Sequence, residues 1–251
     1  MDKKALLRPK LAEIMVDFVF PISELAKKFP DATPSHKDDG SPVTELDLRL
    51  SSLLESMVEK YYSGVTAYSE ESYSDWKFPL LAIDPLDGTK EYLAGRPEWV
   101  VSLGLLESEQ FEGEGWICNP STGEIFNSEM QPHNFVEKSE YYGEVSHSEW
   151  GKGLYHSFKS PKFKLNPMGS IAYKLARLAK GKTDFVVSLA PKNIWDIAGG
   201  TLLCFKSGIK FYSQGKEVTK VEKLYRPPLI WSSSELSPEL LKLFEQTDRY
   251  L

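Results

Sequence analysis

The spacing of apolar residues changes along the chain, and this change restricts the possible folds more than any other sequence feature. Residues 7–25 and 50–61 carry apolar side chains at steps of three and four, which predicts two amphipathic helices. Pro21 is expected to kink or interrupt the first helix. Short apolar runs bounded by turn residues follow, and the last third alternates helical and extended segments. Such alternation predicts sheets covered by helices, and hence a mixed α/β (α+β) fold.

The individual segments are assigned from their periodicity and from the turn residues between them. A long apolar run at 99–106 predicts a central strand, and the runs at 116–118 and 124–126 predict a hairpin. Further strands are expected at 65–68, 80–83, 184–189, 209–212 and 229–231, and further helices at 171–179, 194–206 and 238–246. Residues 132–166 give no clear pattern. A length of 251 residues allows one large domain or two small ones, and we divide the chain into residues 1–137 and 138–251.

Charge and cysteine content exclude several classes of protein. Thirty basic residues stand against 36 acidic ones, a net charge of −6, which disfavours a nucleic-acid polymer as partner. A phosphate substrate remains possible, because a bound divalent metal can reverse the sign of a site. Cys118 and Cys204 form neither a disulfide framework nor a zinc motif. No apolar run approaches the ~18–20 residues of a membrane span, and the first 20 residues lack the features of a signal peptide. We therefore expect a cytoplasmic protein with reduced thiols and no membrane contact.

The segment Asp84-Pro85-Leu86-Asp87-Gly88-Thr89 carries the densest chemistry. A buried strand is expected to end at Asp84, and a tight turn follows in which Gly88 lets the backbone approach a ligand. The two carboxylates and the Leu86 carbonyl are oxygen ligands of the kind that Mg²⁺ prefers. If a helix begins near Thr89, the amides of Gly88 and Thr89 make a seat for an anion. The alternative is an Asx-turn with Asp87 as a helix cap.

Three further acidic residues lie where they can join this segment, and each has a simpler explanation. Glu70 follows a predicted strand, although a Glu-Glu pair is usually a solvated loop. Asp196 lies near the start of a predicted helix, where a carboxylate also complements the helix dipole. Asp47 follows Thr44 by three residues, which is the spacing of a capping box.

Four acidic segments taken together, in this order, resemble the inositol monophosphatase-like family of Mg²⁺-dependent, lithium-sensitive phosphatases. They are residues 38–47 (DDGSPVTELD), 69–72 (SEES), 84–89 (DPLDGT) and 195–199 (WDIAG). The resemblance implies a layered α/β/α/β/α sandwich in which helices cover mixed sheets. It also implies that residues 1–137 form a helix pair and a mostly antiparallel sheet with most metal ligands, and that the α/β part at 138–251 supplies Asp196.

Two strings indicate the 3′(2′),5′-bisphosphate nucleotidase branch of this family. Residues 89–92 (TKEY) and 189–195 (LAPKNIW) are similar to the nucleotidases. Inositol-specific members place a sugar-binding glutamate seven residues before the aspartate of the WD motif, and Leu189 occupies that position here. A leucine side chain accepts no hydrogen bond from a polyol, so the string disfavours inositol phosphate.

The resemblance also implies a role for each site residue. Two or three Mg²⁺ ions would be held by Glu70, Asp84, the Leu86 carbonyl, Asp87 and Asp196. Asp47 would accept a hydrogen bond from Thr89, which would orient the attacking water. Substrate contacts would come from Gly88, Thr89, Gly169, Ser170 and Lys192, the last of them to a second phosphate.

These features together predict an enzyme that removes the 3′-phosphate of 3′-phosphoadenosine 5′-phosphate with a metal-activated water. A phosphatase for inositol or sugar phosphates is the alternative within the same family. A protein that binds nucleotide and metal without catalysis is an alternative of another class. The partner in each case is a small phosphate ester, and the sequence leaves a homodimer possible.

Overall fold

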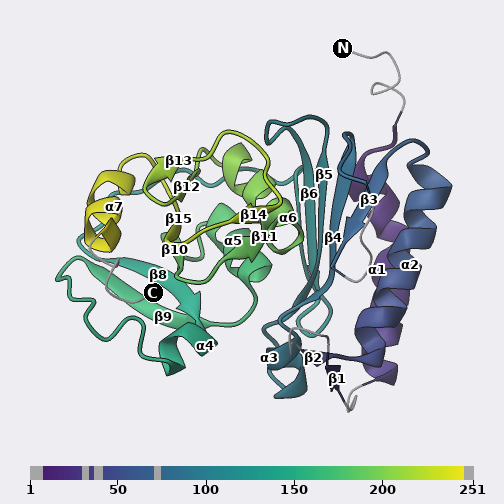
Figure 1. The fold of residues 1–251 in the computed structure, drawn as a ribbon, viewed down its shortest axis with the longest axis horizontal. Helices are drawn as coiled ribbons and strands as arrows, with labels where there is room; N and C mark the ends of the chain where they lie inside the picture. Colours follow the sequence, from purple (N-terminus) through teal and green to yellow (C-terminus); the bar gives the residue numbers. More distant parts are fainter. Residues whose placement is uncertain (1–7, 30–33, 37–41, 71–74, 246–251) are drawn as a thin grey trace.

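The computed structural model describes residues 8–29, 34–36, 42–70 and 75–245 as five stacked layers of helices and sheets (Figure 1). Two helices form one outer layer, and a five-stranded sheet lies beneath them. Two buried helices separate this sheet from a six-stranded sheet, and short helices lie beyond the second sheet. The expected α/β/α/β/α sandwich is confirmed.

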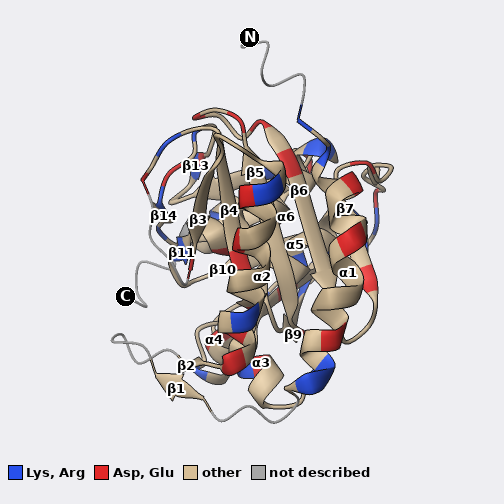
Figure 2. Ribbon diagram, turned by 90° about the vertical axis from the view of Figure 1, so that its right-hand side faces the viewer, with Lys and Arg blue, Asp and Glu red and all other residues tan. Residues whose placement is uncertain are grey.

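The outer layer consists of α1 (Leu11–Lys28) and α2 (Glu45–Tyr61). Each helix turns its apolar stripe toward the sheet, with Leu11, Met15 and Ile22 of α1 fully buried. Figure 2 shows acidic and basic residues distributed along the two helices. Pro21 lies inside α1, so the helix continues through the proline and is not interrupted there. It starts at Leu11, later than the periodicity suggested. The short strands β1 (Ser35–His36) and β2 (Pro42–Val43) precede α2.

The first sheet has the strand order β3-β4-β5-β6-β7. The strands are β3 (Thr66–Ser69), β4 (Leu80–Asp87), β5 (Val100–Leu106), β6 (Gly113–Asn119) and β7 (Glu124–Asn127). Only β3 and β4 pair in parallel, and the remaining pairs are antiparallel. The predicted central strand is β5, all of whose residues are buried, and β6 and β7 form the predicted hairpin.

The second sheet has the order β13-β12-β15-β10-β8-β9. Its strands are β8 (Tyr141–Ser146), β9 (Phe163–Met168), β10 (Phe185–Ser188), β12 (Lys210–Ser213), β13 (Lys216–Glu217) and β15 (Leu229–Ser232). Three elements lie in the stretch that the sequence left unassigned: β8, β9 and the short helix α4 (His147–Gly151). The division of the chain at residue 137 stays a prediction.

The two sheets face each other across α5 (Ile171–Ala179) and α6 (Ile194–Lys206). One apolar core joins residues of both sheets to both helices. The remaining elements are α3 (Thr89–Leu93), α7 (Ser237–Glu245) and the small pair β11 (Lys192–Asn193) and β14 (Leu224–Tyr225). Among the described residues, no helix has the length and apolar character needed to cross a membrane.

Candidate active site

Asp84 and Asp87 lie at the carboxyl-terminal end of β4, an inner strand of the first sheet. The sequence placed the strand end at Asp84, but β4 pairs with β5 as far as Asp87. The pairing register shifts between the two aspartates, so an irregularity replaces the expected strand end. Within it, the Leu86 amide donates to Asp84 Oδ1 over 3.0 Å. The bulged strand thus sets the direction of both carboxylates.

Gly88 follows in a left-handed conformation, with φ +101°, and α3 begins at Thr89, as predicted. A Cβ atom at Gly88 would lie 2.9 Å from the carbonyl oxygen of Glu98, so only glycine fits this turn without displacing its neighbour. The Thr89 hydroxyl is 3.2 Å from the Leu86 carbonyl and 3.4 Å from Asp47 Oδ1. The turn therefore joins β4 to the start of α2.

Asp47 has two separate tasks in this geometry. Its Oδ2 accepts from the Thr44 amide over 2.8 Å and from the Thr44 hydroxyl over 2.5 Å, which closes the capping box of α2. Its Oδ1 faces the Thr89 hydroxyl. The capping box and the contact implied by the family resemblance are both present, one on each carboxylate oxygen.

Negatively charged side chains from four parts of the chain lie close enough to Asp84 to affect its pKa. This aspartate is buried, and burial together with the negative charges of Glu70, Asp87, Asp196 and Asp47 raises its pKa well above the usual value. Glu70 lies beside the end of β4, where its amide donates to the Ile83 carbonyl over 3.2 Å. The remainder of the 69–72 segment, Glu71 and Ser72, and residues 38–41 of the first segment lie outside the described residues.

Asp196 enters this cluster from the first turn of α6. It caps the helix by accepting from the Asn193 amide over 2.8 Å. Burial by the surrounding protein raises the pKa of Asp196 to about 7, although the side chain keeps some solvent contact, and the charges of Asp87 and Glu70 add to that effect. The nearby cation of Lys192 acts in the opposite direction. Lys192, on β11, therefore lies close enough to the acidic cluster to influence it.

Asp87 is turned toward the start of α5. Its Oδ2 accepts from the Ser170 hydroxyl over 2.5 Å and from the Ala172 amide over 2.6 Å. Ser170 has φ +49°, a conformation that costs a non-glycine residue on the order of 1–3 kcal/mol and persists only where its surroundings hold it. Ser170, which the sequence assigned to substrate together with Gly169, thus holds Asp87.

The donor set suits a hard divalent cation. Within the described part of the chain, no three His, Cys, Asp or Glu side chains are grouped as they would be around a metal ion. Asp84, however, is a buried carboxylate surrounded by like charges, and such a cluster is unfavourable unless protons or a cation neutralise it. Carboxylates and the Leu86 carbonyl offer oxygen atoms alone, which is the ligand chemistry of Mg²⁺.

The neighbourhood of Leu189 contains a carboxylate that the sequence did not reveal. Glu149 of α4 is buried, and its Oε2 accepts from the Leu189 amide and the Tyr155 hydroxyl. Its Oε1 accepts from the Ser188 hydroxyl over 2.7 Å. Glu149 is far from Leu189 in sequence, so no local spacing could indicate this contact. Both of its carboxylate oxygens therefore accept hydrogen bonds from within the protein.

Comparison with known proteins agrees with the geometry. Residues 16–247 match the model of the inositol monophosphatase family. The chain is 24% identical over 217 residues to a fructose-1,6-bisphosphatase/inositol-1-monophosphatase of Thermotoga maritima, covering 81% of this chain and 82% of that protein. It is 23% identical over 205 residues to the 3′(2′),5′-bisphosphate nucleotidase CysQ of Escherichia coli, covering 72% and 80%.

Solved structures with a similar fold include inositol monophosphatases. A solved inositol monophosphatase structure from Thermotoga maritima superimposes with a TM-score of 0.77 at 22% identity, over 93% of this chain and 98% of that one. The family model spans nearly the whole described chain, and the resemblance seen in the four acidic segments is confirmed. The chain belongs to the inositol monophosphatase family and is a phosphoric monoester hydrolase.

Proposed function

We propose that this phosphatase is Mg²⁺-dependent and removes the 3′-phosphate of 3′-phosphoadenosine 5′-phosphate. The observation that carries the proposal is the surroundings of Leu189, where inositol-specific members would have a glutamate. Leucine offers no acceptor to a sugar hydroxyl, and the nearby Glu149 already binds Ser188, Tyr155 and the Leu189 amide. The TKEY string at 89–92 and the similarity to CysQ support the nucleotide substrate.

Metal binding is the second part of the proposal. Glu70, Asp84, the Leu86 carbonyl, Asp87 and Asp196 would hold two or three Mg²⁺ ions. Bound Mg²⁺ supplies a water of lowered pKa and neutralises charge on the departing oxygen. Burial and the charges of Glu70, Asp87 and Asp196 raise the pKa of Asp84 in the metal-free protein, and these same three carboxylates would become ligands, so the cluster is suited to cations.

The protein's own groups would orient the reactants. With its proton directed to Asp47 Oδ1, the Thr89 hydroxyl presents a lone pair to a water molecule and can hold that water in line with the phosphate. Thr44 fixes the other oxygen of Asp47, so the acceptor keeps its direction. The amides of Gly88 and Thr89 would bind phosphate oxygens, as backbone donors do in phosphoryl-transfer sites.

A substrate panel tests this proposal. Phosphate release is measured from 3′-phosphoadenosine 5′-phosphate, inositol 1-phosphate and fructose 1,6-bisphosphate, each with Mg²⁺ and with a chelator. We expect the highest kcat/KM for the nucleotide and no release with chelator. A higher kcat/KM for either of the other two substrates would make the enzyme a sugar or inositol phosphatase, a reading that the Thermotoga relative supports. No release from any substrate would favour the non-catalytic alternative.

A variant of Lys192 separates a bisphosphate substrate from a monophosphate one. Lys192 lies beside the acidic cluster and is the candidate for contact with the second phosphate. Lys192→Gln should raise KM for 3′-phosphoadenosine 5′-phosphate but leave KM for adenosine 3′-monophosphate unchanged. Lys216→Gln, at an exposed strand on the far edge of the second sheet, is the matched control. An equal change with both substrates would remove Lys192 from recognition of the second phosphate.

A further inference from the structure

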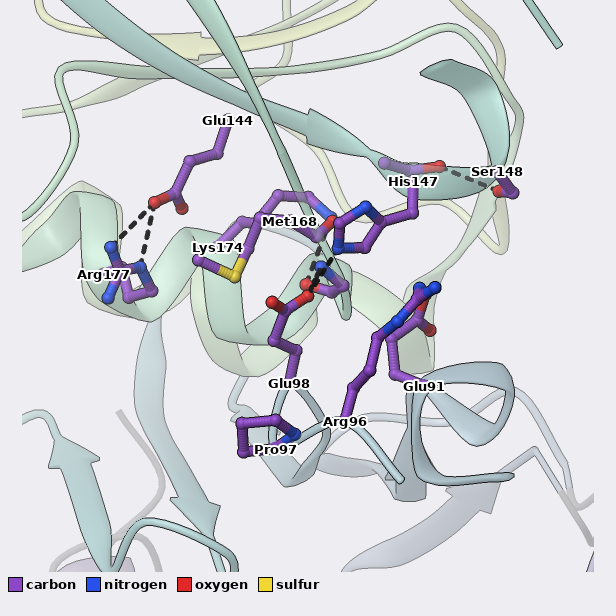
Figure 3. Close-up of polar contacts among 12 residues, drawn as sticks. Glu91, Arg96, Pro97, Glu98, Glu144, His147, Ser148, Met168, Lys174 and Arg177 are labelled. Atoms are coloured by element: carbon purple, nitrogen blue, oxygen red, sulfur yellow. Dashed lines mark hydrogen bonds and ion pairs between the residues drawn. The ribbon is translucent and has the colours of Figure 1, made fainter. Parts of the chain in front are cut away.

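Glu98 precedes β5 and reaches across to the elements beyond the first sheet. Its Oε2 accepts from the Gly169 amide over 2.6 Å and lies 2.8 Å from Nε2 of His147 (Figure 3). Gly169 belongs to the turn between β9 and α5, and His147 begins α4. One carboxylate oxygen therefore ties the first sheet to two separate elements of the second half of the chain.

The backbone of Glu98 lies between the two glycine turns of the site. A Cβ atom placed on Gly88 would lie 2.9 Å from the Glu98 carbonyl oxygen, and one placed on Gly169 would lie 2.8 Å from the same atom. Both turns thus pack against Glu98 as closely as glycine permits. The Glu98 carbonyl therefore lies against both turns, and the side chain of Glu91 lies against the Gly169 turn as well.

The Gly169–Ser170 turn is also held from its other side. Lys174 of α5 is buried, and its ammonium donates to the Met168 carbonyl over 2.9 Å and lies 3.4 Å from the Gly169 carbonyl (Figure 3). Next in the chain, Ser170 donates to Asp87. A shift of this turn relative to Gly88 would therefore move the side chain that holds Asp87.

We propose that Glu98 is a positioning residue that fixes the distance between the Gly88–Thr89 turn and the Gly169–Ser170 turn. The inference rests on the proposed function, in which the first turn binds the phosphate, and on the family resemblance, which implies that the second turn contacts the substrate. The side chains of Glu98 and His147 keep 24% and 29% of their surface exposed, so their contact adds little to folding stability. The role of Glu98 is instead to keep the two turns aligned with two parts of one substrate.

The first test compares Glu98→Ala and Glu98→Gln with the wild type. For Glu98→Ala we expect kcat/KM for the panel's best substrate to fall by about 10- to 100-fold, the effect of a misplacement on the order of 1 Å. The inhibition constant of inorganic phosphate, which contacts the first turn and the proposed metal site but not the remainder of the substrate site, should rise by a smaller factor than kcat/KM falls. Glu98→Gln keeps an acceptor for the Gly169 amide and should recover part of the loss. Glu140→Gln, a surface carboxylate paired with Lys164, is the control and should behave as wild type.

Two results would overturn the role of Glu98: a kcat/KM within about twofold of wild type in Glu98→Ala, or an equal loss of affinity for inorganic phosphate. The thermal midpoint of each variant is measured with the kinetics. If Glu98→Ala unfolds at the assay temperature, Glu98 is a folding residue and the proposal is wrong.

The second test does not need activity. In protein labelled with ¹⁵N-glycine, the Gly169 amide proton should resonate downfield, because it is bound to a carboxylate over 2.6 Å. It should move upfield and exchange faster with solvent in Glu98→Ala. An unchanged Gly169 resonance would overturn the proposed contact. If the wild type hydrolyses no phosphate ester, the function is wrong, whereas this measurement still decides whether Glu98 holds the turn.

Discussion

Thr89 forms the proposed water-activating pair with Asp47, and within the described residues its hydroxyl contacts only Asp47 and Leu86. Thr89→Ala should therefore lower kcat by about 10²- to 10⁴-fold, the usual contribution of a group that orients or deprotonates a nucleophile. The Mg²⁺ concentration at half-maximal activity should stay the same. Thr89→Ser keeps the hydroxyl and should retain most of the activity. An unchanged kcat in Thr89→Ala would remove this residue from the mechanism.

A substitution of the single residue Asp87 tests the proposed metal site. Asp87→Asn keeps an oxygen that can accept from Ser170 and Ala172, so the start of α5 should stay in place. It removes a negative charge from the proposed metal site, and kcat/KM should fall by at least about 100-fold. Circular dichroism and the thermal midpoint check that the fold is kept. Full activity at saturating Mg²⁺ would contradict a role for Asp87 as a ligand.

At the scale of elements, the position of Asp196 depends on how closely α6 packs on the first sheet. A Cβ atom on Gly104 of β5 would lie 2.5 Å from the Ala198 Cβ and 2.8 Å from the Ala198 carbonyl carbon. One on Gly199 would lie 2.7 Å from the Leu103 carbonyl oxygen. Small residues on both surfaces thus let helix and strand touch along their backbones, and Asp196 reaches the acidic cluster because of that contact.

Gly104→Ala should consequently act on stability and on the site together. Overpacking of this kind costs about 1–3 kcal/mol, and the displaced helix should raise the Mg²⁺ concentration needed for activity. Urea unfolding and Mg²⁺ titration of the activity measure the two effects. Gly151→Ala is the matched control, because a Cβ atom at Gly151 of α4 meets open space. If Gly104→Ala lowered stability but left the Mg²⁺ dependence unchanged, the position of Asp196 would not depend on this packing.

The elements also show which features the sequence could and could not reveal. Helices α5 and α6 and strand β5 were predictable, because each is a mainly apolar run that is buried on nearly all sides and is bounded by turn residues. Strand β9 (FKLNPM) was not, since it lies at the sheet edge, contains Pro167 and alternates only weakly. The four acidic segments were recognisable from local motifs. Glu98 was not, because its partners Gly169 and His147 are distant in sequence and are brought to it only by the layered fold.

At the scale of the whole molecule, the acidic cluster couples folding stability to pH. In the unfolded chain Asp196 would titrate near 3.8, whereas in the folded protein its pKa is raised to about 7. Asp84 is shifted in the same direction. Between these two pKa values the folded protein binds more protons than the unfolded chain. The free energy of unfolding therefore falls as pH rises toward 7. For Asp196 alone this loss is at most on the order of 4 kcal/mol.

Metal should reverse that trend, because Mg²⁺ binds the carboxylates in their ionised form. Without metal, the thermal midpoint should fall between about pH 5 and pH 7 and then level off. Mg²⁺ at about 10 mM should raise the midpoint more at about pH 8 than at about pH 5.5, since protons compete with the metal at the lower pH. Asp196→Asn should weaken both effects, whereas Asp184→Asn, at an aspartate paired with Lys138 near the second sheet, should not. An equal rise of the midpoint at both pH values would mean that the buried carboxylates are not the groups that bind the metal.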